Sequence, residues 1–195
     1  MFLGENISLP SGVQRIEYLE SSGTQYIDTG YKFAGNSSHE FEFAFSQDQN
    51  YGAILWGQNS GGSEVFFTGA NGWINGANFN FKGLPANRLY PKNKYKVVVN
   101  AINGSANMSV NGTLVVTSTG NSNNYKELLF VGSTNDAIGN YVKMRYYSYK
   151  RYTNGTLNLD LIPVRVGQTG ALYNKVNGQL LYNAGTGDFI LGPDI

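Results

Sequence analysis

The chain has 195 residues, of which 41% are hydrophobic, so it is long and apolar enough for one domain with a sizeable core. Only 14% are charged, against about 25% in a typical soluble protein, and the formal net charge is +1. A nucleic-acid binder needs clustered Lys and Arg, so this balance argues against that class. Cysteine is absent, which excludes disulfides, Cys-ligated zinc and cysteine nucleophiles.

The first residues differ from the rest of the chain. Residues 1–12 precede the first alternating segment, and we expect them to form an arm or tether that becomes ordered on a partner protein. Residues 13–195 then form the domain. Residues 1–6 lack the basic and apolar regions of a signal peptide, and no run approaches the ~20 apolar residues of a membrane span. We therefore expect a soluble chain with no leader and no membrane insertion.

Apolar and polar residues alternate along most of the chain, whereas helical spacing is rare. The clearest strand covers residues 39–45, where Phe41, Phe43 and Phe45 share one face and the charged residues take the other. Further strands are expected, in chain order, at 14–19, 25–29, 52–57, 64–68, 78–81, 94–102, 107–110, 113–118, 127–131, 141–152, 157–166, 171–173 and 180–182.

Asn-Gly pairs supply the positive φ angles that tight hairpin turns require. Six occur, at 71–72, 75–76, 103–104, 111–112, 154–155 and 177–178. The hairpin over residues 110–114 is the sharpest of them. Short, regularly spaced strands with such turns predict an all-β fold, a two-sheet antiparallel β-sandwich or jelly roll.

Motifs at both chain ends carry a resemblance. They are Leu9-Pro10-Ser11-Gly12 with residues 15–30 at the start, and residues 147–157, 160–165, 170–178 and 183–189 at the end. They resemble concanavalin A-like, laminin-G-like jelly-roll domains of phage virion proteins, in tails or capsid decorations, and of bacterial surface proteins. The resemblance implies this fold and a setting of carbohydrate binding or host adhesion on a virion or extracellular surface. It brings no catalytic motif, and Asn174 stands where the family often has Asp.

The end motifs have a simple structural interpretation. Residues 24–30 and 161–164 are predicted as strands from opposite ends of the chain. We expect them to pair, so that their side chains fix the register and seal an edge of the fold. Function should then lie in the middle of the chain.

Two carboxylates make glycoside hydrolysis a candidate activity, because that reaction needs two carboxylates at a set separation. Glu40 and Glu42 are two residues apart and share a strand face. The glucanases of this fold carry a third acidic residue on one strand, which this sequence does not supply. We interpret the pair as a solvated face opposite Lys94 and Lys96, with each cross-strand pair contributing ~0.2–1 kcal/mol.

The sequence gives little support for a metal site or a catalytic triad. His39 is the sole histidine, so triads and multi-histidine metal sites are excluded, and we predict that it lies on the surface. Calcium has one candidate loop at residues 132–136, where Asp136 and Asn135 offer oxygen ligands. With one carboxylate there, we favour a turn in which both side chains bond their own backbone. No cofactor is therefore expected.

The stretch 56–80 combines aromatic rings with amides. A sugar offers apolar C–H faces ringed by hydroxyls, so it suits a flat ring surrounded by Asn or Gln. The candidate glycan-binding residues are Trp73, Trp56, Asn59, Asn71, Asn75 and Asn78. Trp56 can instead belong to the core, and Tyr51, Tyr90 and Tyr125 offer further rings or merely cover apolar surface.

Three hypotheses follow. The leading one is a non-enzymatic, lectin-like module that binds a glycan or cell-surface polysaccharide through Trp73 and its neighbours, with many weak sites acting together. The second is a virion decoration or tail component, docked to other virion or surface proteins or to a homo-oligomer through residues 1–12, with no ligand of its own. The third is a β-glucan hydrolase that depends on Glu40 and Glu42.

Overall fold

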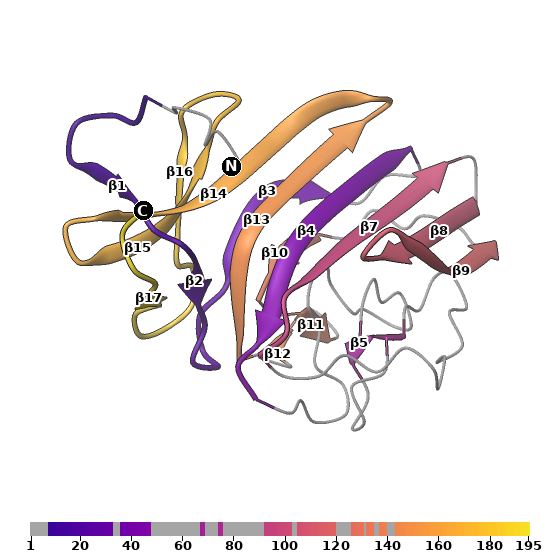
Figure 1. Ribbon diagram of the computed structural model, residues 1–195, viewed down its shortest axis with the longest axis horizontal. Helices are drawn as coiled ribbons and strands as arrows, with labels where there is room; N and C mark the ends of the chain where they lie inside the picture. The colour runs from indigo at the N-terminus through magenta and orange to yellow at the C-terminus, as the bar shows by residue number, and fades with distance from the viewer. Residues whose placement is uncertain are drawn as a thin grey trace.

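The computed structural model describes residues 8–32, 36–47, 67–68, 74–75, 92–102, 105–119, 126–130, 132–134, 137–139 and 143–195. Within these ranges every regular element is a β-strand, and neighbouring strands are antiparallel (Figure 1). No helix in the described ranges has the length and apolar character to cross a membrane. The predicted strands at 52–57 and 78–81 lie outside the described residues. The predicted all-β sandwich is confirmed.

One layer is a broad, curved sheet with β13 and β4 at its centre (Figure 1). Its main path runs in the order β16-β15-β14-β13-β4-β7-β8-β9. These strands are β4 (Ser37–Phe45), β7 (Tyr95–Ile102), β8 (Ser105–Val110), β9 (Thr113–Thr119), β13 (Met144–Thr153), β14 (Thr156–Val166), β15 (Thr169–Asn174) and β16 (Leu180–Tyr182). Three short strands join this sheet beside the main path: β1 (Val13–Arg15), β2 (Leu19–Glu20) and β17 (Ile190–Leu191).

The second layer lies behind this sheet in Figure 1 and contains short strand pairs. Strand β3 (Ile27–Lys32) pairs with β10 (Lys126–Leu129), β11 (Gly132–Thr134) with β12 (Ala137–Gly139), and β5 (Phe67–Thr68) with β6 (Ile74–Asn75). Phe130 follows β10 and meets the ring of Tyr146 in the large sheet edge to face, with centroids 4.7 Å apart. The core therefore fills the space between the two layers.

Strand β4 shows why the alternating pattern builds this sheet. Phe41, Phe43 and Phe45 are buried in the core, while Glu40 and Glu42 between them are only half-buried on the opposite face. Two predicted turns are also confirmed. The pairs 111–112 and 154–155 both have positive φ at Asn and Gly, 49° and 81° in the first and 48° and 77° in the second.

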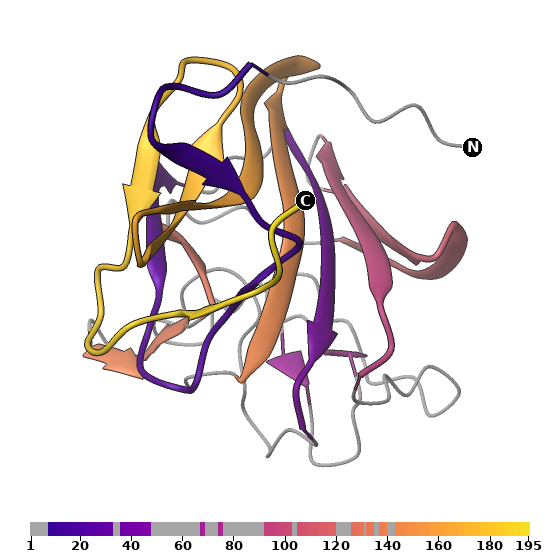
Figure 2. The same cartoon turned by 60° about the vertical axis from the view of Figure 1, so that its left-hand side comes forward.

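The predicted pairing of residues 24–30 with residues 161–164 is wrong. Strand β3 pairs instead with β10 in the other layer, and Val164 of β14 lies opposite Arg15 of β1. The ends of the chain nevertheless meet. The amide of Ile195 donates to the carbonyl of Arg15 at 3.2 Å, and Figure 2 shows β1 beside the C-terminal segment. Alternation fixes which face of a strand is buried, but it does not select the partner strand.

A second contact between the ends is made by residues 24–26 and 183–187. The amide of Tyr26 donates to the Asn183 side chain at 3.1 Å, and the Thr24 hydroxyl donates to the carbonyl of Thr186 at 2.8 Å. Leu9 packs against a small apolar cluster that includes Val164. Residues 1–7 lie outside the described residues, so the expected arm stays a prediction.

Candidate functional site

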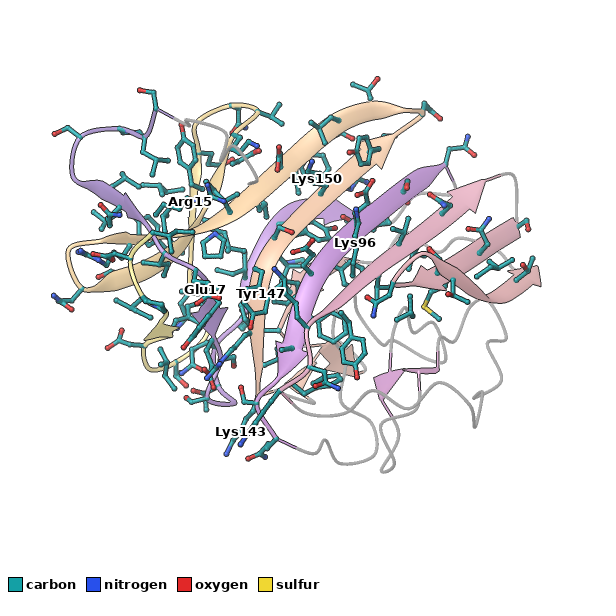
Figure 3. The ribbon with its side chains drawn as sticks, viewed as in Figure 1. Arg15, Glu17, Lys96, Lys143, Tyr147 and Lys150 are labelled. Atoms are coloured by element: carbon teal, nitrogen blue, oxygen red, sulfur yellow. The ribbon has the colours of Figure 1, made fainter. Side chains whose placement is uncertain are left out.

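The large sheet has a polar face that points away from the core, here called the outer face. It carries Ser38, Glu40 and Glu42 from β4, and Lys150 and Tyr152 from β13. Figure 3 labels Lys96 and Lys150 on this face. The predicted ion pairs are confirmed, because the Lys94 ammonium lies 2.8 Å from the Glu42 carboxylate and the Lys96 ammonium 3.4 Å from that of Glu40. Both pairs are partly exposed, so they organise the face without stabilising the fold strongly.

A pocket of about 600 Å³ opens on the outer face where the β13–β14 hairpin turns. The strand register builds it, because Tyr152 lies directly opposite Ser38 and the amide of Asn154 donates to the carbonyl of Asn36 at 2.9 Å. Its volume falls within the roughly 300–1,000 Å³ typical of small-molecule sites. The residues that line it are Asn36, Ser37, Ser38, Glu40, Tyr152, Asn154 and Gly155.

The lining combines one aromatic ring with short polar groups. Tyr152 is half-buried, and Glu40, Asn36 and Asn154 line the pocket with it. The Ser38 hydroxyl donates to the Asn100 side chain, whose amide nitrogen donates to Asn107 at 3.2 Å, so the polar row continues onto β7 and β8. None of the described lining residues is basic. The pocket can therefore hold a small, hydroxyl-rich molecule better than an anion.

A buried polar cluster lies beneath the pocket floor. His39 is inaccessible to solvent, so its predicted surface position is wrong. It lies on the same side of β4 as Phe41, and its two ring nitrogens lie 3.0 Å from the Tyr149 hydroxyl and 2.9 Å from the Ser37 hydroxyl. Ser37 is also among the residues that line the pocket, so the buried cluster and the pocket share this residue. Burial, and then the charge of Arg151, lower the pKa of His39 well below its usual value.

Glu127 and Arg151 complete this cluster. Both are buried, and the Arg151 Nε donates to the Glu127 Oε2 at 2.7 Å. Arg151 also donates to Asn158 at 3.0 Å and to the Lys32 carbonyl at 3.1 Å. Burial raises the pKa of Glu127, and the neighbouring guanidinium opposes that shift. The Glu127 Oε1 has no hydrogen-bond partner among the described residues.

His39 makes stability depend on pH. Its pKa is lowered in the folded state, so as the pH falls below about 6.5 the unfolded chain gains a proton that the folded chain does not. This contribution should reduce the free energy of unfolding by about 1 kcal/mol between pH 7 and pH 5.5. Glu127 acts in the opposite sense, because its raised pKa favours the folded state as the pH falls.

Urea unfolding of wild type and His39→Gln over this pH range separates the two contributions. The difference in stability between the two proteins should shift by about 1 kcal/mol in favour of the variant as the pH falls. Parallel pH profiles would show that His39 does not control this dependence.

Most sequence-predicted glycan residues lie outside the described residues: Trp56, Asn59, Asn71, Trp73 and Asn78, with Tyr51, Tyr90 and Tyr125. Asn75 ends β6, where its backbone lies opposite Phe67. The glycan site predicted for the stretch 56–80 therefore stays a prediction. The structure instead brings together Tyr152, Glu40 and four short polar residues that the sequence reasoning did not connect.

The calcium loop is only partly described. Residues 132–134 form strand β11 rather than a turn, whereas Asn135 and Asp136 lie outside the described residues. In the described part of the chain, no three His, Cys, Asp or Glu side chains gather as a metal site would require. Asn174 is buried, and its side-chain oxygen accepts from the amides of Asp160 and Val176, each at 3.1 Å. Asn174 therefore ties down its own hairpin.

Comparison with known proteins supports the architecture. No protein-family model matches the chain, and no curated protein matches it. A solved structure from Bacteroides ovatus, described as a putative carbohydrate binding protein, is similar over 92% of this chain with a TM-score of 0.63 and 10% sequence identity. This chain spans 60% of the length of that chain. At such low identity the likeness shows a shared β-sandwich fold alone.

Proposed function

We propose that this protein is a non-enzymatic carbohydrate-binding module and that the pocket beside the β13–β14 turn holds a sugar. The observation that carries the proposal is the pocket lining, which combines Tyr152 with Asn36, Asn154 and Glu40. The C–H face of a sugar can pack on the ring, and its hydroxyls can donate to Glu40 and exchange hydrogen bonds with the amides.

The same lining favours binding over hydrolysis. A glycoside hydrolase of the common type needs two carboxylates flanking one bond. Glu40 is the sole carboxylate among the described lining residues, and the neighbouring Glu42 is held by Lys94 at 2.8 Å. A bound sugar would thus meet a hydrogen-bond acceptor without a second catalytic group.

We place the module on a phage particle or a bacterial surface, where many copies would act together. A small, open pocket supports modest affinity, which multivalent display raises by orders of magnitude. The end motifs that resemble virion and surface domains support this setting, while the structural neighbour described as carbohydrate binding supports the class of ligand alone. The expected arm, residues 1–12, would attach the domain to its particle.

A glycan array tests the proposal. The purified protein should bind a subset of glycans, and Tyr152→Ala should weaken that binding about tenfold, which corresponds to the loss of about 1.4 kcal/mol. Tyr182→Ala is the matched control, because Tyr182 is an exposed tyrosine on β16 that does not line the pocket. An equal loss of glycan binding in both variants would contradict the proposal that the pocket holds the sugar.

Two further variants separate the alternatives. Trp73→Ala tests the site predicted from the sequence, and its effect should be smaller than that of Tyr152→Ala if the pocket is the main site. If no glycan on the array binds the protein and its assembly depends on residues 1–12, the hypothesis of a structural virion component would be favoured. Turnover of a β-glucan that disappears in Glu40→Gln would show a hydrolase.

A further inference from the structure

We infer that the ligand is a polysaccharide chain lying along β13, from the pocket at Tyr152 to Tyr147 near the other end of the strand. This inference rests on the proposed carbohydrate function and names the form of the ligand. A terminal sugar would use the pocket alone, whereas a chain would use the outer face as well.

An irregularity in β13 puts both tyrosines on this face. The register between β13 and β4 shifts between Tyr146 and Ser148. Tyr146 and Tyr149 are both buried, so two residues rather than one stand between successive core positions. Residues five apart on a regular strand face opposite sides, but the extra residue of a bulge restores them to the same side. Tyr147 and Tyr152 are therefore aligned along one face.

The spacing of the tyrosines suits a chain. The bulge adds a residue without adding length, so the two tyrosines are separated by about four residues of regular strand, about 13 Å, which is close to the length of two or three sugar rings. Lys150 lies between them on the same face, and Figure 3 shows Tyr147 and Lys150 in line along β13. The shape of the site is thus a row of side chains that begins in the pocket and continues along the strand.

Charges along this row are largely balanced. The cross-strand neighbours of Lys150 are Glu40 and Asp160. Each of these carboxylates already pairs with another lysine. The Lys96 ammonium lies 3.4 Å from the Glu40 carboxylate, and the Lys175 ammonium lies 2.9 Å from that of Asp160. A neutral, hydroxyl-rich chain would find both donors and acceptors here, without the excess of one sign that recognition of a highly charged polymer requires.

The far end of the row is an aromatic cluster. Tyr18 meets Tyr147 edge to face with centroids 5.8 Å apart, and the Lys94 ammonium lies 4.4 Å from the Tyr147 ring centre. A cation–π contact at an exposed site is weak. Lys94 is 53% exposed, so a sugar ring can displace it from Tyr147 at small cost.

Chain-length dependence tests this inference. The probes are neutral oligosaccharides of two, four and six units prepared from β-glucan, mannan, xylan and galactan, titrated by calorimetry. In the series that binds, affinity should rise about tenfold from two units to four and then level off. Tyr147→Ala should remove most of that gain and leave the two-unit affinity unchanged, whereas Tyr152→Ala should weaken every length. Tyr182→Ala is again the control.

Each other outcome is decisive. Equal affinity for two and six units would overturn the extended site and leave the proposed carbohydrate function in place. An equal loss at every length in Tyr147→Ala would do the same, because it would indicate a general disturbance of the sheet. Failure of every series to bind the wild-type protein would overturn both proposals.

Discussion

Replacing Arg151 with methionine should lower the free energy of unfolding by about 3–5 kcal/mol. The guanidinium lies in the buried layer between the sheets, where it pairs with Glu127 at 2.7 Å and also bonds Asn158 and the Lys32 carbonyl. Methionine fills similar space but leaves the Glu127 carboxylate buried without its counter-charge. The desolvation of that charge is then uncompensated, which is why losing one partner costs more than the pair contributes.

Two variants turn this into a test of the buried pair. In the double variant Glu127→Gln with Arg151→Met, no charge remains, so much of the lost stability should return. Arg165→Met is the surface control, because Arg165 pairs with the exposed Asp194 and its replacement should change the free energy of unfolding only slightly. Urea unfolding measures all three variants. A loss in Arg151→Met no larger than that in Arg165→Met would contradict the account of the cluster.

Gly185→Ala should cost about 3 kcal/mol, because the chain ends meet too closely there for a methyl group. A Cβ atom at position 185 would lie 2.2 Å from the carbonyl oxygen of Thr24 and 3.0 Å from the ring of Tyr26. Thr24 is held in place by the 2.8 Å bond from its hydroxyl to Thr186. The obstacle is backbone rather than a flexible side chain, so relaxation is expensive.

Gly167→Ala separates this contact from ordinary backbone strain. Gly167 has a φ of 60°, and no atom of the described residues lies within 4 Å of the place that an alanine methyl group would take. Its replacement should therefore cost only the ~1 kcal/mol of the left-handed conformation. Thermal unfolding of both variants gives the comparison. Equal losses would mean that the two chain ends are less tightly joined than the structure indicates.

Much of the fold could be predicted from alternation. The pattern of apolar residues located β4, β7, β8, β13 and β14 to within a few residues, and two Asn-Gly pairs marked their turns. The short strands β6, β11, β12 and β17 were missed because two or three residues carry too little periodicity. The partner of β3 was wrong for another reason, since strand pairing depends on contacts that no local pattern contains.

The site was harder to predict. His39 is in phase with the buried Phe41 along β4, a signal that could have placed it in the core despite its polar side chain. Glu127 and Arg151 are both buried, yet the sequence does not show that they face each other. The pocket takes residues from 36–40 and 152–155, and only the register of β4 with β13 brings Ser38 beside Tyr152.

The central claim is that a sugar occupies the pocket on the outer face, and nuclear magnetic resonance tests it most directly. The ¹⁵N-labelled protein would be titrated with the glycan that gives the strongest array signal. The account predicts the largest shifts at the amides of Asn36, Ser38, Glu40, Tyr152 and Gly155, with little change across β15. Shifts concentrated elsewhere, with these amides unmoved at saturation, would contradict it.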